Sequence, residues 1–145
     1  MKVDLNDIIF SGRGSSALFS ILKSLDVTKK SILLPVNICE IVFPIVQKAG
    51  FTPVFYDVNE TDGNSRLSNI TATFSGKESV ILAVHNFGSP LEIDIIVDWA
   101  KQNKVFVIED VCNALGAAYQ NKPLGTWGDA AIFSFGYVKI LEYGI

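Results

Sequence analysis

Val80-Ile81-Leu82-Ala83-Val84 is a run of five apolar residues with no polar interruption. Such a continuous run is typical of a strand in a sheet that is covered on both faces. Similar short runs occur on both sides of it along the chain. We therefore expect further strands at residues 31–34, 52–56, 105–108 and 130–135.

Three segments between these strands have the apolar spacing of amphipathic helices. They are residues 15–25, 38–49 and 93–102, and Pro44 is expected to distort the second of them. Residues 59–73 are polar and rich in turn formers, which predicts a surface loop with room for one helical turn. Strands that alternate with helices predict an α/β fold with three layers, α/β/α, around a mostly parallel sheet.

The bulk composition limits the class of protein. The 145 residues are enough for one compact domain, and 49% of them are hydrophobic against 19% charged. This apolar balance predicts a surface that is covered by a second subunit or by the rest of a longer chain. The net charge of −3 argues against a nucleic-acid partner, and no apolar run is long enough to span a membrane. The N-terminal residues lack the pattern of a signal peptide, so we expect a cytoplasmic protein.

Few residues suited to metal binding are present. Cys39 and Cys112 lack CxxC spacing, and His85 is the only histidine. No metal site is expected from this set, and both thiols are expected to be buried packing groups. A mechanism that needs two histidines is excluded.

Ligands of an open parallel sheet bind beyond the carboxyl ends of its strands. Polar side chains follow each of the expected strands, and we expect them to converge on one edge of the sheet. The segments concerned are Pro35 to Cys39, Asp57, His85 to Gly88, Asp110 to Asn113 and Ser134 to Lys139.

Gly12-Arg13-Gly14-Ser15-Ser16-Ala17 opens the first expected helix. Backbone N–H groups at a helix start favour an anion such as phosphate, and the two serine hydroxyls add donors. The same segment could be an ordinary N-cap. It also fits the dinucleotide-binding pattern G-x-G-x-x-A, which needs a strand directly before it; Ile8-Ile9-Phe10 is a poor candidate for that strand.

Two further residues could carry chemistry at this edge. Asp110, together with Glu109, ends a strand that we expect to be buried, where a carboxylate is unfavourable unless it is paired. A protonated pyridine nitrogen could pair with it, or the acid could cap residues 111–115. Lys139 is the only Lys or Arg after Lys122. Its amine could form a Schiff base, or it could be an ordinary solvated lysine.

Several motifs occur in a recognisable order along the chain. They are G-S-S-A-L at 14–18, P-V-F-Y-D-V at 53–58, V-H-N-F-G-S-P at 84–90, V-I-E-D-V-C-N-A-L-G-A-A-Y at 107–119, G-D-A-A-I-F-S-F at 128–135, and then Lys139. In this order the chain resembles the DegT/StrS family of sugar aminotransferases, from about Gly12 to Gly144. The resemblance implies a pyridoxal-phosphate (PLP) enzyme of the aspartate-aminotransferase fold, in which residues 1–145 would form part of the large, cofactor-binding domain.

The resemblance also implies roles for individual residues. Lys139 would hold the cofactor and move protons between cofactor and substrate, and Asp110 would bond the pyridine nitrogen. Asn113 stands where the family usually has Gln near the 3-hydroxyl. Cys39 stands where the family usually stacks an aromatic ring, which predicts a reduced affinity for the cofactor. His85 is expected to be structural. The phosphate contacts would come from Gly14, Ser15, Ser16 and Ser134.

The function implied by the resemblance is transfer of an amino group from an amino acid such as glutamate to a nucleotide-linked keto-sugar, by a homodimer. A related dehydratase branch has histidine in place of the lysine, and Lys139 argues against it. Family chains continue into a small C-terminal domain, so we expect this chain to lack that domain. A non-catalytic fragment or assembly module remains an alternative, as does an NAD-binding domain based on Gly12–Ala17 alone.

Overall fold

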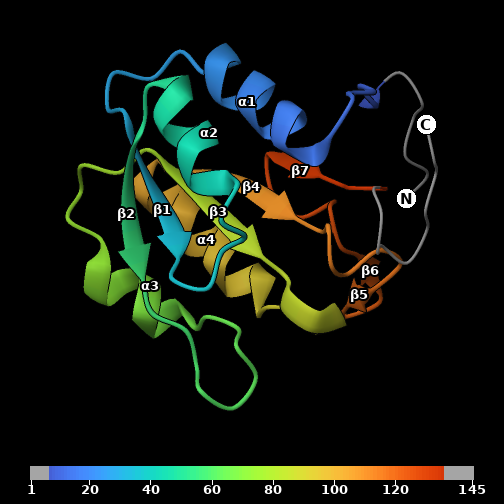
Figure 1. Cartoon of the computed structure of the whole chain (residues 1–145). Coiled ribbons are helices and arrows are strands. Elements are labelled where there is room, and N and C mark those ends of the chain that lie inside the picture. Colours follow the sequence, from blue (N-terminus) through green and yellow to red (C-terminus); the bar gives the residue numbers. More distant parts are fainter. Residues whose placement is uncertain (1–6, 136–145) are drawn as a thin grey trace.

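The fold centres on a parallel sheet. In a computed structural model that describes residues 7–135, the sheet has five strands in the order β2-β1-β3-β4-β7 (Figure 1). All neighbouring pairs in it run parallel, so the predicted parallel sheet is confirmed. The strands are β1 (Ser31–Pro35), β2 (Thr52–Tyr56), β3 (Val80–Val84), β4 (Phe106–Asp110) and β7 (Ala130–Ile132).

Helices cover both faces of this sheet, which confirms the three predicted layers. Residues of α1 and α2 pack against one face, and residues of α3 and α4 pack against the other. The helices are α1 (Gly14–Ser24), α2 (Val42–Ala49), α3 (Leu67–Thr73) and α4 (Ile93–Asn103), with a short 3-10 turn η2 (Asn86–Gly88) and a small antiparallel pair β5 (Ala118–Tyr119) and β6 (Lys122–Pro123).

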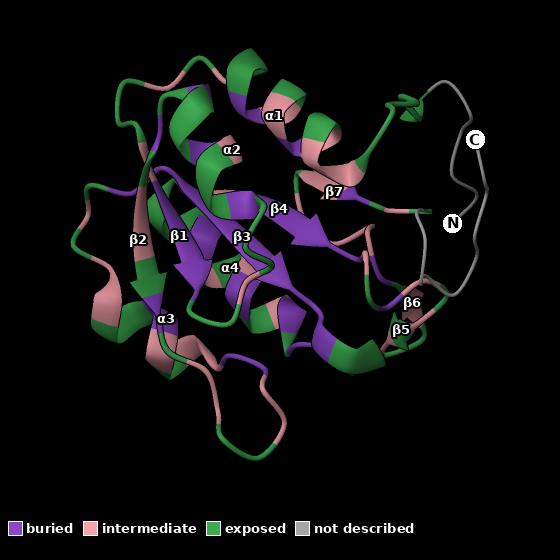
Figure 2. Cartoon of the chain, viewed as in Figure 1, coloured by how far each residue is buried: buried purple, intermediate pink, exposed green. Residues whose placement is uncertain are grey.

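The strands separate two apolar cores because successive side chains point to opposite faces of a sheet. Along β3, Leu82 packs under α1 and α2, whereas Ile81 and Ala83 pack under α3 and α4. Every residue of β3 is buried, as the colours of Figure 2 show for the central strands. The continuous apolar run is therefore explained by burial on both sides.

Two local expectations differ from the structure. The helix expected from residue 38 begins only at Val42, so Pro44 is its third residue and causes no distortion, because the first turn needs no N–H donor there. Residues 67–73 form α3, where a loop was expected. Its first turn is closed by the Asn69 side chain, which accepts a hydrogen bond from the Arg66 amide at 2.9 Å. Ile70 is the only side chain of this helix that is fully buried, so the apolar pattern was too sparse to reveal it.

The direction of the connections changes between β1 and β3, since the helices that follow these strands, α2 and α4, lie on opposite faces of the sheet. Side-chain amides link the loops beyond these strands. Asn64 Oδ1 accepts the Asn86 amide at 3.0 Å, and the Gly63 carbonyl accepts the side-chain amides of Asn37 and Asn86. The described helices include none that is long and apolar enough to cross a bilayer.

Leu82→Ala should lower the free energy of unfolding by about 3 kcal/mol, because it leaves a cavity at a central position that has no exposed surface. Urea unfolding followed by circular dichroism measures the change. Ile95→Ala removes a similar side chain that is 41% exposed, and it should cost less than about 1 kcal/mol. Equal losses in the two variants would contradict this account of the core.

Candidate active site

Asp110 lies at the carboxyl end of β4, on the face of the sheet that α1 covers. Its side chain alternates with that of Glu109 and therefore shares a face with Ile108, which packs in the core beneath α1 and α2. The Asp110 side chain is mostly enclosed, and 8% of the residue is exposed. Oδ1 accepts a hydrogen bond from the Cys112 amide at 2.9 Å. Asp110 therefore caps the turn that follows β4, which was one of the two roles expected for this acid.

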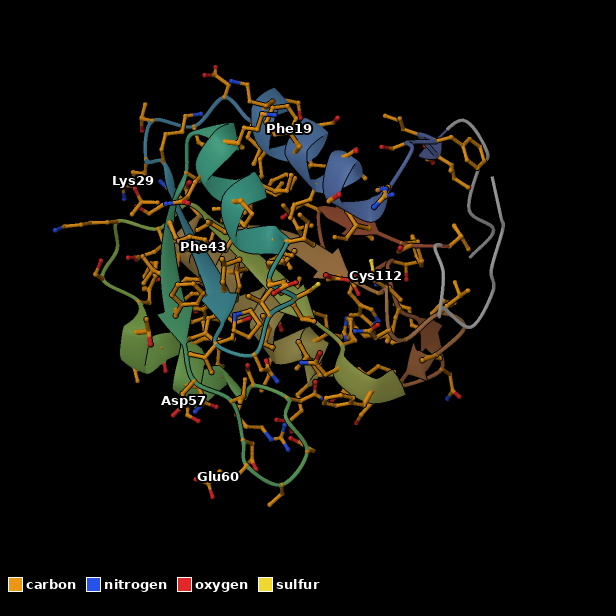
Figure 3. All side chains as sticks on the ribbon, in the orientation of Figure 1. Phe19, Lys29, Phe43, Asp57, Glu60 and Cys112 are labelled. Carbon is orange, nitrogen blue, oxygen red and sulfur yellow. The ribbon has the colours of Figure 1, made fainter. Side chains whose placement is uncertain are left out.

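The start of α1 lies beside this strand end. A Cβ built on Gly14 would lie 3.4 Å from Cys112 Sγ and 3.4 Å from Ser134 Cβ. Helix α1, the turn after β4 and the end of β7 therefore meet at Gly14. In Figure 3, Cys112 is labelled at this junction, beyond the end of β4. Ser134 and the turn that follows Asp110, both expected at this edge of the sheet, thus lie beside the start of α1.

The two serines of the opening motif lie inside the first turn of α1. The N-cap residue is Arg13, whose side chain makes no capping hydrogen bond, which excludes the alternative that a serine of this segment is an ordinary N-cap. The amides of Gly14 and Ser15 fall in the turn where a helix has no acceptors of its own, which leaves them suited to an anion. Residues 8–13 form no strand, and the dinucleotide-binding interpretation therefore loses the strand that it requires.

Other expected site residues lie further away or outside the described part of the chain. Asp57 follows the edge strand β2, three strands from β4 and so about 14 Å away, and it does not join the group. Cys39 is exposed in the loop between β1 and α2, contrary to its expected burial. Asn113 is exposed in the turn after β4. Lys139 lies outside the described residues.

Glu109, the neighbour of Asp110, is fully buried on the opposite face of β4. Its Oε1 accepts the amides of Trp127 at 2.6 Å and Gly128 at 2.8 Å. Its Oε2 accepts the amide of Gly125 at 2.9 Å and faces His85 Nε2 at 3.2 Å. From the sequence alone, a cofactor or a capped turn was the expected partner of the acids at this strand end. The only histidine, placed at the end of the adjacent strand, was the signal that could have identified Glu109.

Burial raises the pKa of Glu109, but hydrogen bonds from His85 and from the Gly128, Gly125 and Trp127 amides outweigh it, so that the pKa lies below its ordinary 4.5. His85 Nδ1 accepts the Leu91 amide at 3.1 Å. Its other nitrogen, Nε2, therefore carries the proton that faces Glu109, and the ring is a neutral imidazole. His85 is fully buried and joins two loops, in agreement with the structural role that was expected for it.

The groups at the α1 edge fit the two ends of a phosphorylated pyridine. A helix start with serine hydroxyls suits a phosphate, and a shielded carboxylate suits a protonated ring nitrogen. The two ends would be held by different elements, because Ser15 and Ser16 belong to α1 and Asp110 belongs to β4. This donor set is compatible with PLP.

Solved structures share this architecture. An aminotransferase from Psychrobacter cryohalolentis superposes with a TM-score of 0.86 at 33% identity, over 92% of this chain and 34% of that one. The parallel sheet and its two helical layers thus have the fold of the PLP-dependent aminotransferases, the aspartate-aminotransferase fold.

The sequence identifies the family within that class. The profile of the DegT/DnrJ/EryC1/StrS aminotransferase family matches residues 6–144, and the chain belongs to this family. A dTDP-4-dehydro-2,3,6-trideoxy-D-glucose 4-aminotransferase of Saccharopolyspora spinosa is 29% identical over 99% of the chain and 38% of its own length. A dTDP-4-dehydro-2,6-dideoxy-D-glucose 3-dehydratase of the same organism is 36% identical over 63% of the chain and 20% of its own length. The chain thus spans well under half of these relatives.

Glu109→Gln should lower the free energy of unfolding at neutral pH by about 2 kcal/mol, because an NH2 group would then face backbone N–H donors. The pKa of Glu109 is lower in the folded protein than in the unfolded chain. Its contribution is therefore complete above 4.5 and is lost as the pH falls through the folded-state pKa. Urea unfolding of both proteins from neutral pH down to the acid transition tests this. A difference between them that stays constant over the whole range would contradict it.

Proposed function

We propose that the protein is a PLP-dependent aminotransferase that moves an amino group from an amino acid such as glutamate to a nucleotide-linked keto-sugar. The observation that carries this proposal is the meeting of α1, the turn after β4 and the end of β7 around Gly14. Family membership supports the reaction type. The relatives named for sugar nucleotides support the class of substrate.

Each proposed residue has a distinct task. The amides of the first turn of α1, with Ser15, Ser16 and Ser134, would bind the phosphate, while Asp110 would hold a proton on the pyridine nitrogen. When bound, PLP supplies a ring that withdraws electrons from the substrate carbon beside the nitrogen. The Lys139 amine would hold the cofactor and then carry a proton between a carbon of the substrate and a carbon of the cofactor.

Two positions would modify the binding of the cofactor. Cys39 would lie near the ring in place of an aromatic side chain, and Asn113 would approach its 3-hydroxyl with a short amide. A thiol offers less stacking surface than an aromatic ring. We therefore propose that the affinity for PLP is lower than in relatives that stack an aromatic ring.

Absorption spectroscopy tests the cofactor proposal. PLP added to the protein should produce an absorption band near the visible edge. Lys139→Ala should abolish this band because the covalent link is lost. Asp110→Asn keeps an oxygen for the Cys112 amide and should leave the fold intact. This second variant should slow transamination of glutamate on the order of 100-fold or more. A band that persists unchanged in Lys139→Ala would contradict the role of the lysine.

We also propose that the protein works as a homodimer in the cytoplasm. Several large apolar side chains are exposed, among them Ile9 at 89% and Phe10 at 87%, and such surfaces are usually covered in an assembly. Light scattering at micromolar concentration should give the mass of a dimer, and a uniform monomer would contradict the assembly.

A non-catalytic module that keeps the fold is the second candidate. It is favoured by Cys39 and Asn113, which replace the aromatic ring and the Gln that the family usually has beside the cofactor. Such a protein would form the dimer, yet it would not exchange amino groups between glutamate and keto-sugars. Transamination that depends on Lys139 would exclude it.

A further inference from the structure

Glu109 is a buried anion whose charge is stabilised by N–H donors from two separate loops. The turn at 125–128 contributes three backbone amides, and His85 contributes a ring N–H. A buried carboxylate that loses such donors becomes strongly unfavourable. The positions of both loops relative to β4 are therefore coupled to this one side chain.

This coupling fixes the direction of the neighbouring acid. The Asp110 carbonyl accepts the His85 amide at 3.1 Å, and on the other side Val111 donates to the Ile132 carbonyl at 3.0 Å. Adjacent side chains of a strand point to opposite faces. With Glu109 held on the α4 face and the backbone paired on both sides, Asp110 must point to the α1 face.

The same carboxylate positions the segment that leads to Ser134. The turn at 125–128 runs directly into β7, and β7 ends two residues before Ser134. The backbone of Gly128 lies so close to β4 that no side chain fits there, because a Cβ on it would lie 2.8 Å from the Val107 carbonyl oxygen. Asp129 adds a second connection, since its Oδ2 accepts the Val107 amide at 2.8 Å. The register between β4 and β7 is thus set next to Glu109.

We propose that Glu109 is a positioning residue that fixes the distance between Asp110 and Ser134, which would bind opposite ends of the cofactor. This inference rests on the proposed function. Glu109 itself lies on the far side of the sheet and would not touch the cofactor. Its effect is transmitted through the backbone of β4 on one side and through the turn at 125–128 on the other.

The experiment compares Glu109→Gln with Glu78→Gln. Glu78 is also a buried carboxylate that accepts a backbone amide, from Ser75 at 2.9 Å, but it lies before β3 at the opposite end of the strands. Glu109→Gln should weaken PLP binding roughly 10-fold or more and change the position or pH midpoint of the cofactor absorption band. Glu78→Gln should leave the band and the affinity as in the wild type. His85→Gln alters one of the four donors to Glu109, together with the acceptor of the Leu91 amide, and should give a smaller change in the same direction as Glu109→Gln.

A second measurement needs no cofactor. Hydrogen exchange of the Cys112 amide, which reports the Asp110 carboxylate, should speed up roughly 10-fold or more in Glu109→Gln and remain unchanged in Glu78→Gln. If the wild type fails to bind PLP, the proposed function is wrong, and this exchange rate still decides the positioning role. If Glu109→Gln and His85→Gln match Glu78→Gln in cofactor spectrum and in exchange, the inference is overturned.

Discussion

A carboxylate without access to water must find all of its hydrogen-bond donors inside the protein, and Glu109 imposes that requirement on the whole carboxyl edge of the sheet. The turn at 125–128 directs three amides at it, and His85 turns its ring toward it. The turn at 125–128 also packs through Trp127 against the core on this face, and Asp129 bonds to the backbone of β4. The Glu109 carboxylate is the group that joins this turn and His85 to the same point of β4.

The two neighbouring acids at the end of β4 have different environments because they face different layers. Glu109 is satisfied entirely by the protein, whereas Asp110 has one hydrogen bond to the Cys112 amide and lies at the junction of α1 and β7. A strand that ends in two acids can thus use one for the fold and the other for a ligand. Two adjacent residues can have these separate roles because successive side chains of a strand point to opposite faces of the sheet.

Much of the fold followed from the sequence, because β1, β3 and β4 are short apolar runs whose burial on both faces leaves a clear pattern, and the edge strand β2 is also an apolar run. Helix α3 was expected only as one turn within a loop, since a single buried residue, Ile70, gives no periodicity. Asp110 and Ser134 were expected at the same edge of the sheet, but Asp57 was wrongly included because the strand order was unknown. The partners of Glu109 come from residues 16 to 24 positions away in the chain, and only the folded backbone shows which amides reach it.

The loops beyond β1, β2 and β3 are joined by hydrogen bonds of a different chemical kind. Asn37, Asn64 and Asn86 bond there to amide or carbonyl groups that do not titrate, whereas the contacts at the β4 and β7 end depend on an ionised Glu109. Acidification therefore weakens the hydrogen bonds of Glu109 at the carboxyl edge of the sheet, but it does not weaken those of the asparagine side chains. The β4–β7 half would loosen first, and the half built on asparagines would persist as the more acid-resistant part of the domain.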